Sequence, residues 1–437
     1  MMRILTLAAF LILAALPVRA DQNIQIVTSP GGVTAWLVEE HSIPFIALEI
    51  RFRGGTSLDL PGKEGATYMM AGLLEEGAGE LDAEAFLKAR EALAASFGFD
   101  AHGDAISVSA QFLTENRAEA QALLRLALQE PRFDSQALDR VRAQVISIIA
   151  SDRKDPHSIA SAEFDRQAFG DHPYGGPSTG TEDSVNRLGR DDMIAAYQNA
   201  MARDRVYVAA VGDITADQLA ELLDDLLGGL PETGSVLPPP ADVTLSGGTT
   251  VIDFPSPQAV AVFGHAGIRR DDPDFFAAYV MNQVFGAGGL TSRLSEEVRE
   301  KRGLTYGVYT YLANYDMADL FIGSVASSND RIAEAVAVIR AEWQRLASEG
   351  VTGEELEAAK KYLTGAYPLR FDGNGRIAKI LVSMQLDGLP PSYIDTRNDL
   401  VNAVTQDDVA RVAARLLQPE NLRVVVVGQP VGLESSD

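Results

Sequence analysis

The chain has 437 residues, 46% of them hydrophobic and 22% charged, which is the composition of a globular protein of two or three domains. Asp and Glu number 61 against 37 Lys and Arg, and the resulting net charge of -24 argues against binding to nucleic acid. The sequence contains no Cys, which excludes disulfides, thiolate zinc sites, iron–sulfur clusters and a cysteine nucleophile.

The first twenty residues are typical of an export signal. Arg3 precedes an apolar run of about 13 residues, shorter than the roughly 20 that a membrane-spanning helix needs. Small or short side chains at Val18 and Ala20 fit a signal-peptidase site. We therefore expect cleavage after Ala20 and, in a Gram-negative bacterium, a periplasmic protein. A retained N-terminal anchor is the alternative.

Hydrophobic spacing predicts grouped strands and helices in the first half of the chain. The expected strands cover residues 24–27, 34–39, 45–52 and 106–112, and the expected helices cover residues 64–74, 82–97, 118–129 and 135–151. Because strands and helices are grouped and do not alternate strictly, the pattern favours an α+β packing over a doubly wound parallel sheet.

Two pairs of similar segments indicate a duplicated domain. A helical pattern followed by a strand and a glycine occurs at residues 190–212 and again at 406–428. A second pair of similar segments, 66–79 and 277–288, lies earlier in each half. The two pairs occur in the same order, which a single chance match would not produce.

A Gly- and Pro-rich segment separates the two halves, and it can form neither a helix nor a sheet ladder. This segment sets the domain limits. We predict a signal peptide over residues 1–20, a first domain over 21–227, a linker over 228–248 and a second domain over 249–437.

Two familiar catalytic patterns are weak in this sequence. The histidines lie too far apart to share one helix face as in a helical zinc site: His41, His102, His157, His172 and His265. Residues 176–180 match the G-x-S-x-G pattern of a serine nucleophile, but a loop and not a strand precedes Ser178. A hydrolase built on Ser178 is therefore the weakest hypothesis.

The most informative segment covers residues 285–312. Its pattern predicts a flexible loop over 285–289, a helix over 293–302 and a strand over 304–312. Arg299 and Tyr306 would then lie near one connection, where a guanidinium and a phenol can polarise a carbonyl group. A solvated Arg and a core Tyr are the alternative interpretation.

The segments LTSRL (290–294) and VREKRGLTY (298–306) resemble the second-domain signature of the pitrilysin-like zinc metallopeptidases, the family of insulinase and the mitochondrial processing peptidase. Residues 169–175 and 272–274 fit the same family. The resemblance extends over nearly the whole mature chain. It implies two homologous domains, each a mixed, largely antiparallel sheet with helices packed on it, that together form a clam-shell.

At the family's zinc site this sequence departs from the pattern. Active members carry H-x-x-E-H on a first-domain helix, where this chain has Tyr68, Met69, Met70, Ala71 and Gly72. The third ligand, a Glu on a later helix, corresponds to Val141, or to Gln144 if the alignment shifts. By this comparison the chain has no metal site and no general base of its own.

Some members of the family divide their work between two chains, and this chain resembles the one that lacks H-x-x-E-H. The resemblance implies a heterodimer with a homologous catalytic subunit that holds Zn²⁺, in which Arg299 and Tyr306 complete the active site. Gly286, Gly288 and Gly289 match the place of a substrate-handling glycine-rich loop, which is shorter here. The expected substrates are unfolded peptides. A proteolytically inactive binding or structural protein of the same fold is the alternative.

Overall fold

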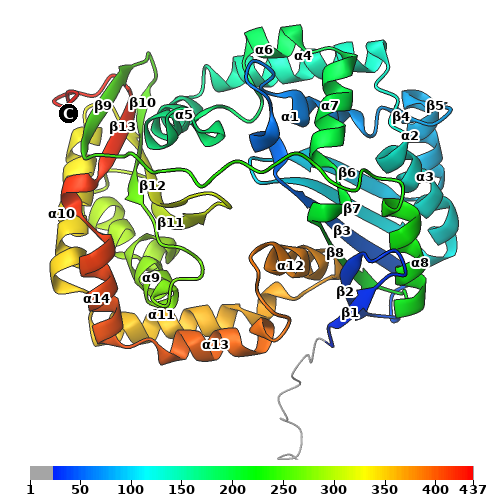
Figure 1. The fold of residues 1–437 in the computed structure, drawn as a ribbon. Helices are drawn as coiled ribbons and strands as arrows, with labels where there is room; N and C mark the ends of the chain where they lie inside the picture. The colour runs from blue at the N-terminus through cyan, green and yellow to red at the C-terminus, as the bar shows by residue number, and fades with distance from the viewer. Residues whose placement is uncertain (1–22, 437) are drawn as a thin grey trace, which may run out of the picture.

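The computed structural model describes residues 23–436, which form two halves around two β-sheets (Figure 1). The export signal predicted over residues 1–20 lies outside the described residues. Within residues 23–436, no helix is both long enough and apolar enough to span a bilayer.

The first sheet has six strands in the order β1-β2-β8-β3-β7-β6. Its strands are β1 (Gln25–Thr28), β2 (Thr34–Glu39), β3 (Phe45–Arg53), β6 (Ser96–Ala101), β7 (Ala105–Leu113) and β8 (Val206–Gly212). Only the pair β2 and β8 is parallel, so the sheet is mixed and largely antiparallel, as predicted.

The second sheet repeats this plan with five strands in the order β11-β12-β10-β13-β9. They are β9 (Gly248–Asp253), β10 (Gln258–Ala266), β11 (Val308–Asn314), β12 (Asp319–Ser328) and β13 (Arg423–Gly428). Again one pair, β13 and β9, is parallel and the others are antiparallel. The strands β2-β8-β3-β7-β6 of the first sheet correspond in order to β9-β13-β10-β12-β11 of the second, and the single parallel pair is the first pair in both. This correspondence confirms the α+β fold of two homologous halves.

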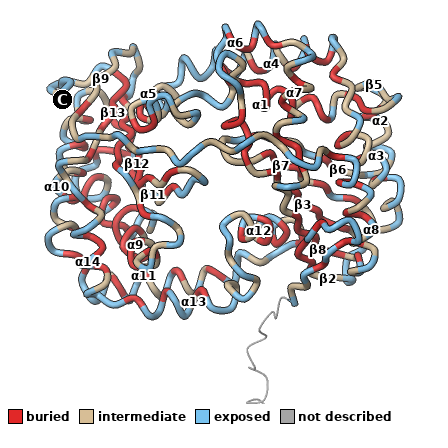
Figure 2. Tube along the Cα trace, in the orientation of Figure 1, coloured by how far each residue is buried: buried red, intermediate tan, exposed pale blue. Residues whose placement is uncertain are grey.

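Helices from each half cover one face of that half's own sheet. In the first half they are α1 (Ala66–Leu73), α2 (Ala83–Ala92), α3 (Arg117–Gln129), α4 (Ser135–Asp152), α6 (Glu182–Arg187), α7 (Arg190–Ala200) and α8 (Ala216–Leu227). In the second half they are α9 (Phe275–Asn282), α10 (Ile332–Glu349), α11 (Gly353–Ala366), α13 (Tyr393–Ala403) and α14 (Gln406–Leu416). Each set encloses one large hydrophobic core, seen as buried tube segments in Figure 2.

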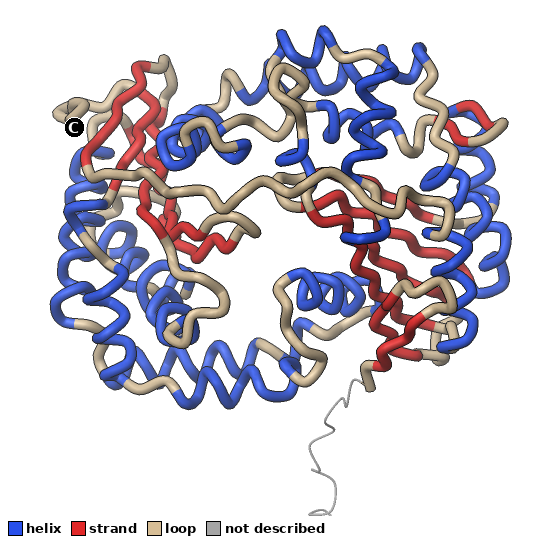
Figure 3. Tube along the Cα trace, in the orientation of Figure 1, coloured by secondary structure: helices blue, strands red, loops and turns tan. Residues whose placement is uncertain are grey.

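The other face of each sheet is covered by a helix from the opposite half. Helix α12 (Asn374–Leu386) packs on β3 and β8 of the first sheet, and α5 (Pro156–Phe169) packs on β10 and β13 of the second. Strand residues alternate between the faces, so Ala210 points to the first half's own helices while Val211 points to α12. Residues 228–247, which contain no helix or strand, also run between the halves (Figure 3).

Most predicted elements of the first half are confirmed within one or two residues, and one is wrong. The helix expected over 82–97 ends at Ala92, and residues 96–101 form the edge strand β6. Ala94 has a left-handed backbone with a φ of 48°, which ends the helical path.

The exchange of helices makes α12 a stabilising element of the first sheet. Leu381 of α12 is fully buried among Trp36, Ala47 and Val211, so Leu381→Ala should lower the free energy of unfolding by about 3 kcal/mol. Leu400→Ala on α13, where the side chain is 43% exposed, is the matched control and should cost less than about 1 kcal/mol. Urea denaturation measures both, and equal losses would contradict the packing of α12.

Candidate functional site

Apolar side chains fill the place of the family's zinc site. Residues 68–72 lie in helix α1, where Met69, Met70 and Ala71 are buried. A Cβ atom built on Gly72 would lie 3.6 Å from Cγ1 of Val141 on α4, so these two positions face each other. Gln144, the other position considered for the third ligand, is exposed.

These residues do not fit a zinc ion. Protein zinc sites are built from Cys, His and carboxylate ligands, and positions 71, 72 and 141 offer only hydrocarbon or no side chain. Burial, together with the charges of Asp100 and Asp152, raises the pKa of Tyr68, so its phenol stays protonated. In the part of the chain that the structure describes, no three His, Asp or Glu residues lie together as a metal ion would require.

Ser178 lies in the loop between the 3-10 turn at Pro173–Gly175 and helix α6. A serine nucleophile elbow needs a strand directly before the serine and a helix directly after it. The loop around Ser178 has neither, so the structure does not support the hydrolase hypothesis.

The signature run, residues 290–306, forms a more irregular structure than predicted. A π-helix at Ser295–Glu300 replaces the α-helix expected over 293–302, and β11 begins at Val308 instead of residue 304. The amide of Lys301 donates to the carbonyl oxygen of Glu296, five residues back, which is the π-helical pattern. Leu294 and Val298 are fully buried in this arrangement.

The glycines before the signature run have different surroundings. The prediction of a flexible loop over 285–289 is wrong for residues 285–287, because Gln283–Ala287 forms a second π-helical turn. A Cβ atom on Gly286 would lie 2.7 Å from the backbone nitrogen of Thr310, so close packing on β11 requires glycine there. Gly288 and Gly289 lie in the turn that follows, and Gly289 has a φ of 61°.

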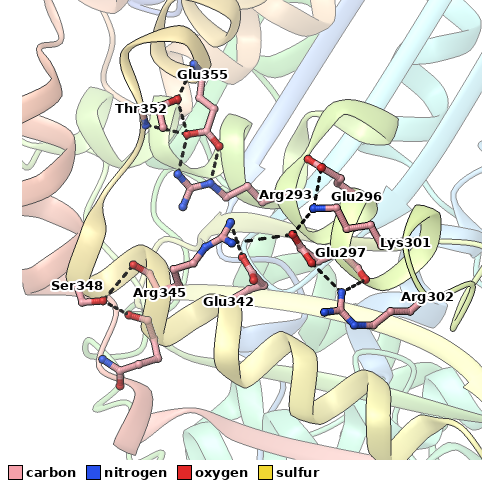
Figure 4. Close-up of polar contacts among 11 residues, drawn as sticks. Arg293, Glu296, Glu297, Lys301, Arg302, Glu342, Arg345, Ser348, Thr352 and Glu355 are labelled. Atoms are coloured by element: carbon pink, nitrogen blue, oxygen red, sulfur yellow. Dashed lines mark hydrogen bonds and ion pairs between the residues drawn. The ribbon is translucent and has the colours of Figure 1, made fainter.

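One partly buried ion pair fixes the start of the signature run (Figure 4). The Arg293 guanidinium, 7% exposed, donates to both carboxylate oxygens of Glu355 on α11, at 2.5 and 2.6 Å. Burial acts against ionisation, but Arg293 and the amide of Thr352 lower the pKa of Glu355 to about 2. The pair is therefore ionised at neutral pH and ties the run to α11.

A second group of ion pairs fixes the π-helix. Glu297 accepts from Lys301 and from Arg302, both at 2.7 Å (Figure 4). Arg345 on α10 lies 3.9 Å from Glu297 and pairs with Glu342 at 3.0 Å. These contacts lower the pKa of Glu297 and fasten the π-helix to α10.

Arg299 and Tyr306 lie outside this network. Tyr306 is 90% exposed in the turn before β11, so the core interpretation of this tyrosine is wrong. The Arg299 side chain is 34% exposed, and its one ion pair within the described residues is with the adjacent Glu300 at 3.4 Å. The structure thus places Arg299 in the last turn of the π-helix and Tyr306 in the connection to β11, and among residues 23–436 no hydrogen bond links their side chains.

A cavity of about 870 Å³ lies between the halves, and the sequence did not predict its composition. Tyr174, from the segment 169–175, donates to Asp104 of the first half and accepts from the amide of Met317 in the second. Burial raises the pKa of Asp165, in the cavity wall on α5, to about 7. The resemblance to the family at residues 169–175 drew attention to this segment, but it did not indicate that Tyr174 contacts both halves.

Comparison with known proteins finds similar proteins in the family that the sequence resembles. The family model described as "Peptidase M16 inactive domain" matches residues 187–363. A Helicobacter pylori protein named "Non-peptidase homolog YmxG" is 28% identical over 76% of this chain and 77% of its own length. The crystal structure of a peptidase M16 inactive domain from Pseudomonas fluorescens is 27% identical, covers 95% of this chain and all of that one, and has a TM-score of 0.88. A Schizosaccharomyces pombe protein named "Probable mitochondrial-processing peptidase subunit beta" is 25% identical over 72% of this chain and 71% of its own.

The duplicated fold and the apolar zinc position therefore fit an inactive homologue of the metallopeptidases, in line with these comparisons. These similarities confirm the resemblance to the pitrilysin-like M16 family that the sequence shows.

Removal of divalent metal should leave the protein unchanged. Because residues 68, 71, 72 and 141 offer no zinc ligands, exhaustive dialysis against a chelator should change the free energy of unfolding by less than about 0.5 kcal/mol. Elemental analysis and urea denaturation before and after dialysis measure this. Stoichiometric zinc whose removal destabilises the protein would contradict the structure.

The Arg293–Glu355 pair should make stability depend on pH. The folded pKa of Glu355, about 2, lies below that of an unfolded Glu, so the stabilisation is complete above about pH 5 and is lost as the pH falls toward 2. Glu355→Gln should cost roughly 3 kcal/mol at pH 7, because it leaves Arg293 buried without its partner, and clearly less at pH 2.5.

Denaturation of Glu355→Gln at both pH values gives this difference. Glu357→Gln on the same helix is the matched control, because the Glu357 side chain is 75% exposed. A cost for Glu355→Gln that does not change with pH would show that the pair contributes nothing through its charge.

Proposed function

We propose that this chain is the non-catalytic subunit of a heterodimeric zinc metallopeptidase that cleaves unfolded peptides. Its partner would be a homologous subunit that carries H-x-x-E-H, holds the Zn²⁺ and supplies the general base. This chain would contribute Arg299 and Tyr306 to the partner's active site. The relative named as a mitochondrial-processing peptidase subunit supports an assembly of more than one chain.

The observation that carries the proposal is the contrast within the signature run. Four of its charged residues are used internally: Arg293, Glu297, Lys301 and Arg302. Arg299 and Tyr306 are not used in this way, although Arg299 lies within the π-helix and Thr305, next to Tyr306, donates to the carbonyl oxygen of Ala326 on β12. Exposed polar groups on a rigid support are expected where a protein meets a ligand, not where it builds a core.

The surroundings of Tyr306 suit an extended peptide. Tyr306 lies two residues before β11, which is the edge strand of the second sheet. An edge strand offers unpaired amide and carbonyl groups to which a peptide can add as a further strand. Only an unfolded peptide has a backbone free to do so. In this pose the Tyr306 phenol would donate to the carbonyl oxygen of the scissile bond, and Arg299 would hold the peptide on the C-terminal side of that bond.

We propose the substrate-handling role for Gly288 and Gly289 but not for Gly286. Gly286 is buried against Thr310, whereas Gly289 is exposed at the surface turn. We also propose that the protein acts after export, in the periplasm of a Gram-negative cell, with the signal cleaved after Ala20.

A binding or structural protein that assists no proteolysis is the second candidate. It is favoured by the relative named "Non-peptidase homolog YmxG", whose name assigns no peptidase activity. The two candidates differ in whether Arg299 and Tyr306 affect a partner's rate.

Reconstitution with the H-x-x-E-H homologue of the same organism tests the proposal. Cleavage of an unstructured peptide should appear only in the mixture, and Tyr306→Phe should lower its kcat about 10²-fold, the usual cost of one oxyanion donor. Arg299→Gln should act mainly on KM, because its role is to hold the substrate.

Tyr362→Phe, at another exposed tyrosine on α11, is the matched control and should leave the rate unchanged. Size-exclusion chromatography should show the same complex for all variants. Full activity of the double variant Arg299→Gln/Tyr306→Phe within an intact complex would favour the binding protein instead.

A further inference from the structure

A second pocket, of about 390 Å³, is lined by residues of α9, α12 and α13 and of the segments next to them. Figure 1 shows where these three helices lie. The lining residues of this pocket are different from those of the cavity between the halves. It is also separate from the signature run, so neither the zinc position nor Arg299 and Tyr306 accounts for it. Its volume is within the range of small-molecule sites, about 300–1,000 Å³.

The pocket concentrates positive charge in a strongly acidic protein. The only carboxylate in its lining is that of Asp387, and the lining also has five cationic side chains, which leaves a local charge of +4. The cationic residues are Arg270, Arg370, Arg376, Lys379 and Arg397. Within residues 23–436 none of these five forms an ion pair, whereas the neighbouring Arg269 pairs with Asp271. The chain as a whole has a net charge of -24, so carboxylates to neutralise them are not scarce.

Arg397 is the deepest of these cations. It is 4% exposed, and its guanidinium donates to the carbonyl oxygen of Leu363 at 2.8 Å and to the Tyr279 hydroxyl at 3.1 Å. It also stacks on the Tyr367 ring at 4.6 Å. All of these partners are neutral. A buried charge without a counter-charge is costly, and a bound anion would supply the missing partner.

Aromatic rings surround Arg270, another of the lining cations. Its guanidinium lies 4.2 Å from the centre of the Phe275 ring and 5.2 Å from that of Tyr393, and it donates to the Tyr393 hydroxyl at 2.7 Å. Arg376 and Lys379 follow at i and i+3 on α12, so they share one helix face, and both are exposed. The pocket therefore combines two guanidinium groups packed against aromatic rings with two exposed cations on α12.

We propose that this pocket binds a compact, multiply charged oxyanion, either a phosphate or a polycarboxylate. Guanidinium groups pair with the oxygens of both anions through two parallel hydrogen bonds, and their planar shape makes this geometry specific. A single negative charge would leave most of the +4 unbalanced, so the ligand carries several charges. The site does not depend on the proposed peptidase role.

Calorimetric titration of the full chain with inorganic pyrophosphate and, separately, with citrate tests the proposal. One equivalent of at least one anion should bind at fixed ionic strength. Arg376→Gln/Lys379→Gln should weaken the tighter of the two by roughly tenfold or more, because two charge-assisted contacts are lost. Both substitutions are at exposed positions, so they leave the fold intact. Arg397→Gln should abolish binding.

Lys154→Gln/Arg187→Gln is the matched control. It removes the same charge from exposed positions at the opposite end of the molecule, near α4 and α6 (Figure 1), and should change the affinity less than threefold. Tighter binding of pyrophosphate identifies a phosphate ligand, and tighter binding of citrate identifies a polycarboxylate. Equal weakening by the two double variants, or no binding of either anion by the unchanged protein, would overturn the proposal.

Discussion

The structure depends on the need to cover both faces of two apolar sheets. The central strands β8 and β13 are buried on both sides, with Val208 and Ala210 toward one core and Ala209 and Val211 toward another. One set of helices can cover only one face. The second face of each sheet is covered by a helix from the other half, so neither half has a complete core alone.

This exchange fixes the relative position of the two halves without a large direct interface between the sheets. Helix α5 carries Phe164 into the second half, and α12 carries Leu381 into the first. The same helices bring polar groups to two separate pockets: Asp165 of α5 lines the cavity between the halves, and Arg376 and Lys379 of α12 line the cationic pocket. The two pockets are thus consequences of a packing requirement in the cores.

Local patterns were sufficient to predict the regular elements. The strand at 34–39 and the helix at 64–74 are found almost at their predicted bounds, because alternation and helical spacing are properties of a few adjacent residues. The apolar zinc position could also be predicted, because it rests on the identity of residues 68–72. The π-helix at 295–300 could not, because no local pattern marks it and one ion pair of its Glu297 reaches Arg345 on α10, far away in the sequence.

Long-range features were beyond any local pattern. The segments that line the cationic pocket extend from Arg270 to Arg397, and their side chains meet only because α13 and α12 fold back on α9. Arg299 and Tyr306 could be selected from the sequence, yet their exposure depends on where the internal network of the run ends. Exposure is a property of the folded surface, which explains why the core interpretation of Tyr306 failed.

The acidic surface and the cationic pocket act at different distances. At physiological ionic strength charges are screened over about 8 Å, so an approaching anion meets the net repulsion of the surface before it meets the pocket. A singly charged anion gains little on arrival, because two exposed cations at the mouth are well hydrated. An anion with several charges gains from Arg270 and Arg397 together, in a volume from which much water is displaced. The same protein can therefore carry a large net negative charge and still select a small, densely charged anion.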